Sequence, residues 1–218
     1  MKNYIYILAL LSLIYCTKES KISSVISSQD SAVINPGDSL SKTNQNLETK
    51  NLSKDETLRT LNNEILSTLK SKDFMKFSNY IHPEKGITFS MYAHLDLKED
   101  KHFTKEEFIK FIPTNVKFTW GEKDGTADKL VLPIRDYLQE WVFRKDFMQG
   151  EYHLNSFKGS GNSLNNLREI YPTLDFTENY LPGSEEYGEM DWNSLRFVFD
   201  KYEGQYYIVA VINDSWTI

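Results

Sequence analysis

The fold is decided by residues 196–213, which read RFVFDKYEGQYYIVAVIN. Residues 196–200 and 205–213 are rich in aromatic and β-branched side chains, and Glu203-Gly204 lies between them. This pattern is typical of two antiparallel strands that are joined by a tight turn. We therefore predict a β-hairpin at the end of the chain.

More strands are predicted upstream of this hairpin. Residues 151–155 and 173–180 have strand composition, and residues 158–166 between them form a loop of Gly, Ser and Asn. Residues 182–188 are a polar loop that leads toward the hairpin. The second half of the folded region is thus expected to consist mainly of strands.

Helices dominate the first half. Ser53-Lys-Asp-Glu56 is a capping box, and leucine and isoleucine residues follow it at helical spacing from Leu58 to Leu69. The later predicted elements are a short helix capped by Asp73, a strand at 87–91, a helix capped by Thr104, strands at 116–120 and 129–132, and a helix that starts at Pro133. Helices followed by adjacent strands predict an α+β fold, with N-terminal helices packed on one face of a curved, mainly antiparallel sheet.

The N-terminus has the features of a leader. Lys2 precedes an apolar run of 12 residues at positions 4–15, whereas a helix that spans a membrane needs about 20. Leu13-Ile-Tyr-Cys16 resembles the signal of bacterial lipoproteins, although Tyr15 stands where that family has a small residue. The alternative is that Cys16 is an ordinary apolar residue in a leader that is cleaved elsewhere.

The lipoprotein resemblance implies a signal peptide at residues 1–15 and a lipid anchor on Cys16, with acyl chains such as palmitate. The protein would then attach to a membrane of the bacterial cell envelope through Cys16. Thr17 follows the cysteine, and by the same resemblance this favours the outer membrane or the cell surface.

Residues 16–53 are predicted to be a flexible tether. Nine serines occur between residues 17 and 54, and no aromatic residue lies between Tyr15 and Phe74. Of the 30 aromatic residues (13 Phe, 13 Tyr and 4 Trp), 27 fall after residue 73. A segment with so few large apolar groups does not offset its ordering entropy, and its typical reach is about 35 Å. The single folded domain is therefore expected at residues 54–218.

Composition excludes several classes of protein. The chain has 25 Lys and Arg against 31 Asp and Glu, a net charge of −6, which argues against nucleic acid as a partner. Its single cysteine excludes an internal disulfide and a zinc site built on several thiolates. His94 and His102 lie in an acidic loop, where a weak metal site competes with a simple solvated loop. We expect neither a metal nor a cofactor.

Two further resemblances concern the folded region. The order of its elements is similar to the nuclear-transport-factor-2-like (cystatin-like) fold. Four motifs resemble a family of secreted and lipid-anchored bacterial proteins of unassigned function: His82-Pro-Glu-Lys-Gly86, Trp120-Gly-Glu-Lys-Asp-Gly125, Met190-Asp-Trp-Asn-Ser-Leu-Arg196 and Trp216-Thr-Ile218. This second resemblance supports the domain assignment and implies no activity.

The abundance of aromatic residues suggests a binding pocket. Seven residues are candidates to line it: Tyr92, Trp120, Trp141, Trp192, Trp216, Asp191 and His82. The alternative is that the aromatic residues fill the core. No nucleophile elbow, P-loop or dinucleotide motif occurs in the sequence.

The leading hypothesis is therefore a lipid-anchored envelope protein with a non-catalytic binding or structural domain. Its partner would be a small-molecule ligand or another envelope protein that docks on exposed aromatic residues. The alternative is a pocket enzyme of the nuclear-transport-factor-2-like kind, in which a buried Asp191 or Asp214 is the general base and His82 or Tyr92 is its partner.

Overall fold

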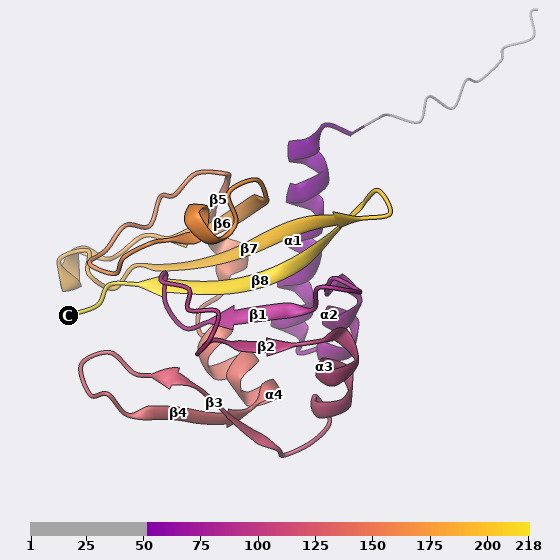
Figure 1. Cartoon of the computed structure of the whole chain (residues 1–218). Coiled ribbons are helices and arrows are strands. Elements are labelled where there is room, and N and C mark those ends of the chain that lie inside the picture. Colours follow the sequence, from indigo (N-terminus) through magenta and orange to yellow (C-terminus); the bar gives the residue numbers. More distant parts are fainter. Residues whose placement is uncertain (1–51) are drawn as a thin grey trace, which may run out of the picture. The chain divides into compact units, whose positions relative to one another are not determined.

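A six-stranded sheet organises the protein, whose computed structural model describes residues 52–218 (Figure 1). The strand order is β2-β1-β8-β7-β6-β5, and all neighbours are antiparallel except β1 and β8. The strands are β1 (Ile87–Ser90), β2 (Lys101–Phe103), β5 (Glu151–Leu154), β6 (Asp175–Leu181), β7 (Asn193–Tyr202) and β8 (Gln205–Ser215). The predicted α+β fold with a mainly antiparallel sheet is confirmed.

Three predictions lie outside the described residues. These are the signal peptide at residues 1–15, the lipid anchor on Cys16 and all but the last two residues of the tether at 16–53. None of the helices in residues 52–218 combines the length and the apolar character that a membrane crossing requires.

The predicted hairpin is the centre of the sheet. Strands β7 and β8 pair from Asn193↔Ser215 to Tyr202↔Gln205. Glu203 and Gly204 join the strands with φ angles of 49° and 82°. Two positive φ angles are characteristic of the type I′ turn, whose twist matches that of the flanking strands, and glycine adopts this conformation without a steric penalty.

Capping side chains start the helices at the predicted places. In α1 (Lys54–Ser71), the Glu56 amide donates to Ser53 Oγ at 3.2 Å, and the Ser53 amide donates to the Glu56 carboxylate at 2.9 Å. Asp73 caps α2 (Phe74–Phe77), and Thr104 forms a second capping box with Glu107 in α3 (Lys105–Phe111). The other helical segments are η1 (Ser78–Tyr80), α4 (Ile134–Tyr137), the π-helical η2 (Leu138–Val142), η3 (Phe147–Gln149), α5 (Leu167–Ile170) and η4 (Glu185–Tyr187).

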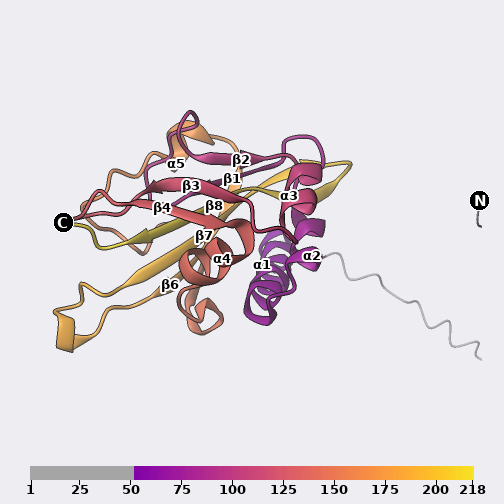
Figure 2. The same ribbon diagram turned by 90° about the horizontal axis from the view of Figure 1, so that it is seen from below.

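One face of the sheet carries the larger core. Helices α1 and α4 lie on this side, as Figure 2 shows, and the hairpin of β3 (Lys117–Glu122) and β4 (Lys129–Pro133) packs against the same core. Its buried side chains include Leu58, Ile65, Phe89, Phe108, Trp120, Tyr137, Leu195, Phe197 and Val211. A polar contact also joins α1 to the sheet, because the amides of Asn62 and Asn179 bond each other at 2.8 and 2.9 Å.

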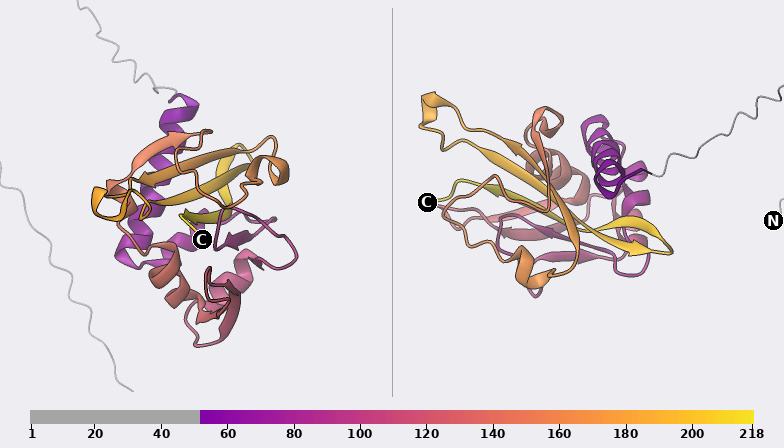
Figure 3. Two further views of the ribbon diagram at one scale, coloured as in Figure 1. Left: turned by 90° about the vertical axis from the view of Figure 1, so that its left-hand side faces the viewer. Right: turned by 90° about the horizontal axis from the view of Figure 1, so that it is seen from above.

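The opposite face carries a smaller core. Helix α5 lies there (Figure 2), and Leu167 packs with Phe176, Val198, Ala210 and other residues of the sheet. The sequence predicted helices on one face only. It missed α5 because a helix of four residues has no apolar periodicity to detect. Figure 3 shows that the connection between β6 and β7 projects from the rest of the domain.

Candidate binding site

Three charged side chains meet on the face of the sheet that carries α5. Strand register places Glu178 of β6 beside Arg196 of β7, and Ser194 of β7 beside Asp214 of β8. Alternation along each strand directs these residues to one face. Glu178 and Arg196 are 0 % exposed and Asp214 is 3 % exposed, so the charges lie inside the protein. We call Glu178, Arg196 and Asp214 the charged cluster.

Arg196 holds the charged cluster together. Its Nε donates to Glu178 Oε1 at 2.8 Å, and its Nη2 lies 2.7 Å from the same oxygen. Nη2 also donates to Asp214 Oδ2 at 2.8 Å. The guanidinium therefore links two carboxylates that would otherwise repel each other across β7.

The glycine-rich loop predicted at residues 158–166 covers the charged cluster. The amides of Lys158 and Gly159 donate to Glu178 Oε2, and the Gly159 carbonyl accepts from Arg196 Nη2 at 3.1 Å. A Cβ on Gly159 would lie 2.5 Å from Ser194 Oγ and 2.7 Å from the Trp192 ring. Only glycine allows the main chain to approach the charges this closely.

Two polar atoms of the charged cluster have no partner. Neither Asp214 Oδ1 nor Arg196 Nη1 forms a hydrogen bond with any described residue, although both atoms are buried. A buried polar group without a partner is costly, and most such groups in folded proteins are satisfied by protein, water or a ligand. The charged cluster therefore has spare capacity to accept and donate hydrogen bonds.

Burial raises the pKa of the Asp214 carboxyl above its usual range. The facing Arg196 guanidinium and the Ser215 amide lower the pKa in turn, and they offset only part of the effect of burial. The ionised form of Asp214 is thus incompletely stabilised within the folded protein.

A cavity of about 250 Å³ adjoins Asp214. Its other lining residues come from the glycine-rich loop and its flanks: Phe157, Gly159, Ser160, Gly161, Ser163 and Asn165. We call this space the Asp214 cavity. The Phe157 ring is half-exposed, stacks on Phe176 with ring centres 4.6 Å apart, and lies 5.0 Å from the Arg196 guanidinium. The cavity thus combines one buried carboxylate, hydroxyl groups and an aromatic ring.

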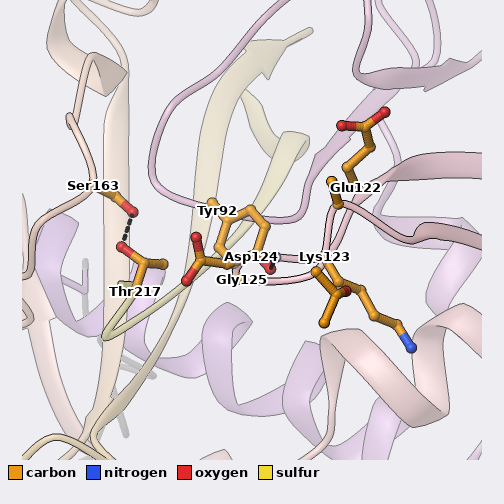
Figure 4. Close-up of a pocket in the computed structure, with 9 residues that line it drawn as sticks. Tyr92, Glu122, Lys123, Asp124, Gly125, Ser163 and Thr217 are labelled. Carbon is orange, nitrogen blue, oxygen red and sulfur yellow. Dashed lines mark hydrogen bonds between the residues drawn. The ribbon is translucent and has the colours of Figure 1, made fainter.

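A second cavity of about 580 Å³ also has Ser163 in its wall (Figure 4). It is lined mainly by the β3–β4 turn, together with Tyr92 and Thr217. Ser163 Oγ and Thr217 Oγ1 are hydrogen-bonded at 3.0 Å, and the Tyr92 hydroxyl accepts from the Asp124 amide at 2.8 Å. Of the polar side chains drawn in Figure 4, Ser163 and Thr217 thus bond each other, and Tyr92 bonds the main chain of the β3–β4 turn.

The tryptophans predicted to line a pocket are spread over the domain. Trp120 is buried, stacks on Tyr137 with ring centres 3.6 Å apart and donates to the Leu132 carbonyl. It is therefore a core residue, as the alternative to a pocket predicted. Trp192 is buried against the glycine-rich loop, and Trp216 is 39 % exposed.

Within residues 52–218, only one pair of the predicted pocket residues is in ring-to-ring contact. Tyr92 and Trp141 meet edge to face at 5.8 Å, and Trp141 donates to the Met91 carbonyl at 3.2 Å. His82 is buried elsewhere, where its Nδ1 accepts from the amides of Glu84 and Lys85. These bonds order the turn at residues 82–86, and burial lowers the pKa of His82.

The two aspartates considered as general bases differ in position. Asp191 is exposed and accepts from the amide and hydroxyl of Ser184 at 2.6 and 3.1 Å. Asp214 is buried beside a cavity, but its side-chain partner is Arg196 rather than His82 or Tyr92. The hydrogen bonds of residues 52–218 thus do not include the predicted contact of Asp191 or Asp214 with His82 or Tyr92.

The acidic loop of His94 and His102 has local contacts. His102 Nδ1 lies 3.1 Å from Thr88 Oγ1, and Asp100 accepts from the Asp96 amide. Burial raises the pKa of Asp100 to about 6. Across residues 52–218, His, Cys, Asp and Glu side chains form no group of three or more that is suited to a metal ion.

Sequence reasoning missed Glu178, which completes the charged cluster. Two signals were present: Arg196 is a cation inside the apolar run Leu195-Arg-Phe-Val-Phe199, and Glu178 shares the alternation of the apolar residues Phe176 and Tyr180. A charge within a buried strand requires a partner of opposite charge, and the neighbouring strands are where such a partner is expected.

Comparisons with known proteins add no relative. The chain matches no protein-family model, and a search of curated proteins finds no match.

Proposed function

We propose that this chain is a lipid-anchored protein of the bacterial cell envelope, and that its folded domain is a non-catalytic module that binds a small molecule. The observation that carries the binding function concerns Asp214. This residue lines a cavity, and its buried Oδ1 has no hydrogen-bond partner among the described residues. A carboxylate that lines a cavity can accept a hydrogen bond from a ligand that enters it.

The anchor is supported by the sequence. A short apolar leader ends at Cys16, and a segment poor in aromatic residues then leads to the capping box at Ser53. Two or more acyl chains on one cysteine would hold the protein stably, because each buried CH₂ contributes about 0.8 kcal/mol. The binding module would thus be held at a membrane surface of the envelope.

Binding accounts for Asp214 better than general-base catalysis does. Arg196 Nη2 holds Asp214 Oδ2 at 2.8 Å, and a guanidinium, which stays protonated in proteins, cannot relay a proton to or from this carboxylate. The burial of Asp214 beside a cavity is the feature that favours the enzyme. If the protein converts a small molecule and Asp214→Asn abolishes that activity, the enzyme hypothesis is correct.

Two measurements on the full chain test the proposal. Labelled palmitate should be incorporated into the wild type and into Ser20→Ala, but not into Cys16→Ala. Native mass spectrometry of protein released gently from its own envelope should detect a bound small molecule that is lost in Asp214→Asn and kept in Asp191→Asn. Labelling of Cys16→Ala would refute the anchor, and a bound mass that persists in Asp214→Asn would refute the site.

A further inference from the structure

We infer that the Asp214 cavity binds a small organic ligand through a primary ammonium group. This inference rests on the proposed binding function and names the chemical class of the ligand. Three features of the site carry it: the charge of the cluster, the unpaired oxygen of Asp214, and the size and walls of the cavity.

The charged cluster has an excess of negative charge. Glu178 and Asp214 each carry one negative charge when ionised, and Arg196 supplies a single positive charge between them. Arg144 also interacts electrostatically with Asp214, but it forms neither a hydrogen bond nor an ion pair with either carboxylate of the cluster among the described residues. An uncompensated charge inside a protein is costly, so a ligand cation is more favourable here than a neutral molecule.

The unpaired Asp214 Oδ1 favours a ligand that donates a hydrogen bond. Arg196 occupies Asp214 Oδ2, and the Ser215 amide lies near the carboxylate, but no hydrogen bond of good geometry reaches Oδ1. A primary ammonium carries three N–H donors in addition to its charge. One donor would serve Asp214 Oδ1, and the hydroxyl oxygens of Ser160 and Ser163 line the same cavity as further acceptors.

A metal ion fits the site poorly. Calcium takes 6–8 oxygen ligands and magnesium demands a regular octahedron, whereas the Asp214 cavity offers one unpaired carboxylate oxygen. The volume of about 250 Å³ corresponds to about eight water molecules, which is room for a small organic molecule. The Phe157 ring adds an apolar wall that also attracts cations.

The test uses two probes of the same size that differ in charge. Ethanolamine and ethylene glycol are titrated into the full chain, purified in detergent, and binding is followed by isothermal titration calorimetry. Ethanolamine should bind, and ethylene glycol should bind at least tenfold more weakly. Asp214→Asn should weaken ethanolamine binding at least tenfold, and the control Asp191→Asn should leave it unchanged.

A second pair of variants avoids the charged cluster itself. Ser160 is exposed in the glycine-rich loop, so Ser160→Lys should fold and place a tethered ammonium at the cavity. It should abolish ethanolamine binding, whereas Ser160→Met, of similar length but neutral, should weaken binding by much less. Equal losses in these two variants would overturn the inference.

Other outcomes are equally decisive. No binding of ethanolamine, or equal binding of both probes, would show that the site does not select an ammonium group. Such a failure is distinct from failure of the proposed function, because palmitate labelling and a bound mass of another chemical class would remain as predicted for a lipid-anchored binding protein.

Discussion

Three consecutive residues of β6 enter two different polar clusters on opposite faces of the sheet. Thr177 and Asn179 face α1, where both bond Asn62 at distances of 2.8 to 2.9 Å. Glu178 faces the glycine-rich loop and joins the charged cluster. The side-chain polar atoms of Asn62, Thr177 and Asn179 are all paired, whereas the charged cluster leaves two buried atoms unpaired.

This contrast distinguishes buried polar residues that stabilise the fold from buried polar residues that are suited to bind a ligand. A buried network whose members satisfy one another fixes α1 against the sheet and needs nothing further. A buried cluster with spare acceptors and donors is incomplete without water or a ligand. The three predictions below test this contrast, and they run from the largest expected effect to the smallest.

Replacement of Arg196 should have the largest effect. Arg196→Met leaves Glu178 and Asp214 buried without their shared cation, so the free energy of unfolding should fall by about 3–5 kcal/mol. Urea unfolding measures the change. The half-exposed Arg135→Met is the matched control and should stay within about 0.5 kcal/mol of the wild type.

The double variant Glu178→Gln/Arg196→Met sharpens this prediction. Removal of one negative charge together with the cation should recover part of the lost free energy of unfolding, because fewer buried charges remain uncompensated. A double variant that is less stable than Arg196→Met alone would contradict the electrostatic account of the charged cluster.

Loss of Asn62 should have an intermediate effect. Asn62→Ala leaves Thr177 Oγ1 without its acceptor and weakens the pairing of Asn179, so the free energy of unfolding should fall by about 1–3 kcal/mol. Thr60→Ala, at an exposed position of the same helix, should change it by less than about 0.5 kcal/mol. Ethanolamine affinity should be unchanged in folded Asn62→Ala, and a loss of affinity there would remove the distinction between the two clusters.

The smallest effect concerns Asp214 and pH. Because burial holds the native pKa of Asp214 above its unfolded value of about 3.9, protonation favours the folded state. This contribution to stability is fully present below the unfolded pKa and is lost as pH rises through the native pKa. Asp214→Asn should lack it, so its unfolding free energy should fall less over that interval in urea melts at stepped pH. Parallel pH profiles for the two proteins would contradict the raised pKa.

Local signals in the sequence predicted much of the fold. The capping boxes at Ser53 and Thr104 act within one helical turn, so they mark the starts of α1 and α3 without knowledge of the rest of the chain. The β7–β8 hairpin is local in the same sense, because its turn and both strands are contiguous. These elements required no information about tertiary contacts.

Features that depend on distant contacts were not predicted. Strand β2 has only three residues, and the parallel pairing of β1 with β8 joins Thr88 to Ala210 across most of the domain. Glu178 shares the alternation of the apolar residues Phe176 and Tyr180, but no local pattern identifies the loop that covers it or the cation that pairs with it. Of the candidate site, the sequence supplied Asp214 as a general-base candidate, but not its cation or its partner carboxylate.

The position of β8 has a consequence for how the chain acquires its structure. This strand lies between β1, near the beginning of the domain, and β7, and it is the only parallel neighbour of β1 in the sheet of residues 52–218. The sheet therefore stays incomplete until residues 205–215 are available to pair with both neighbours. In a nascent chain that lacks them, β1 and β7 have no common partner, and the pairing of such distant segments is slow.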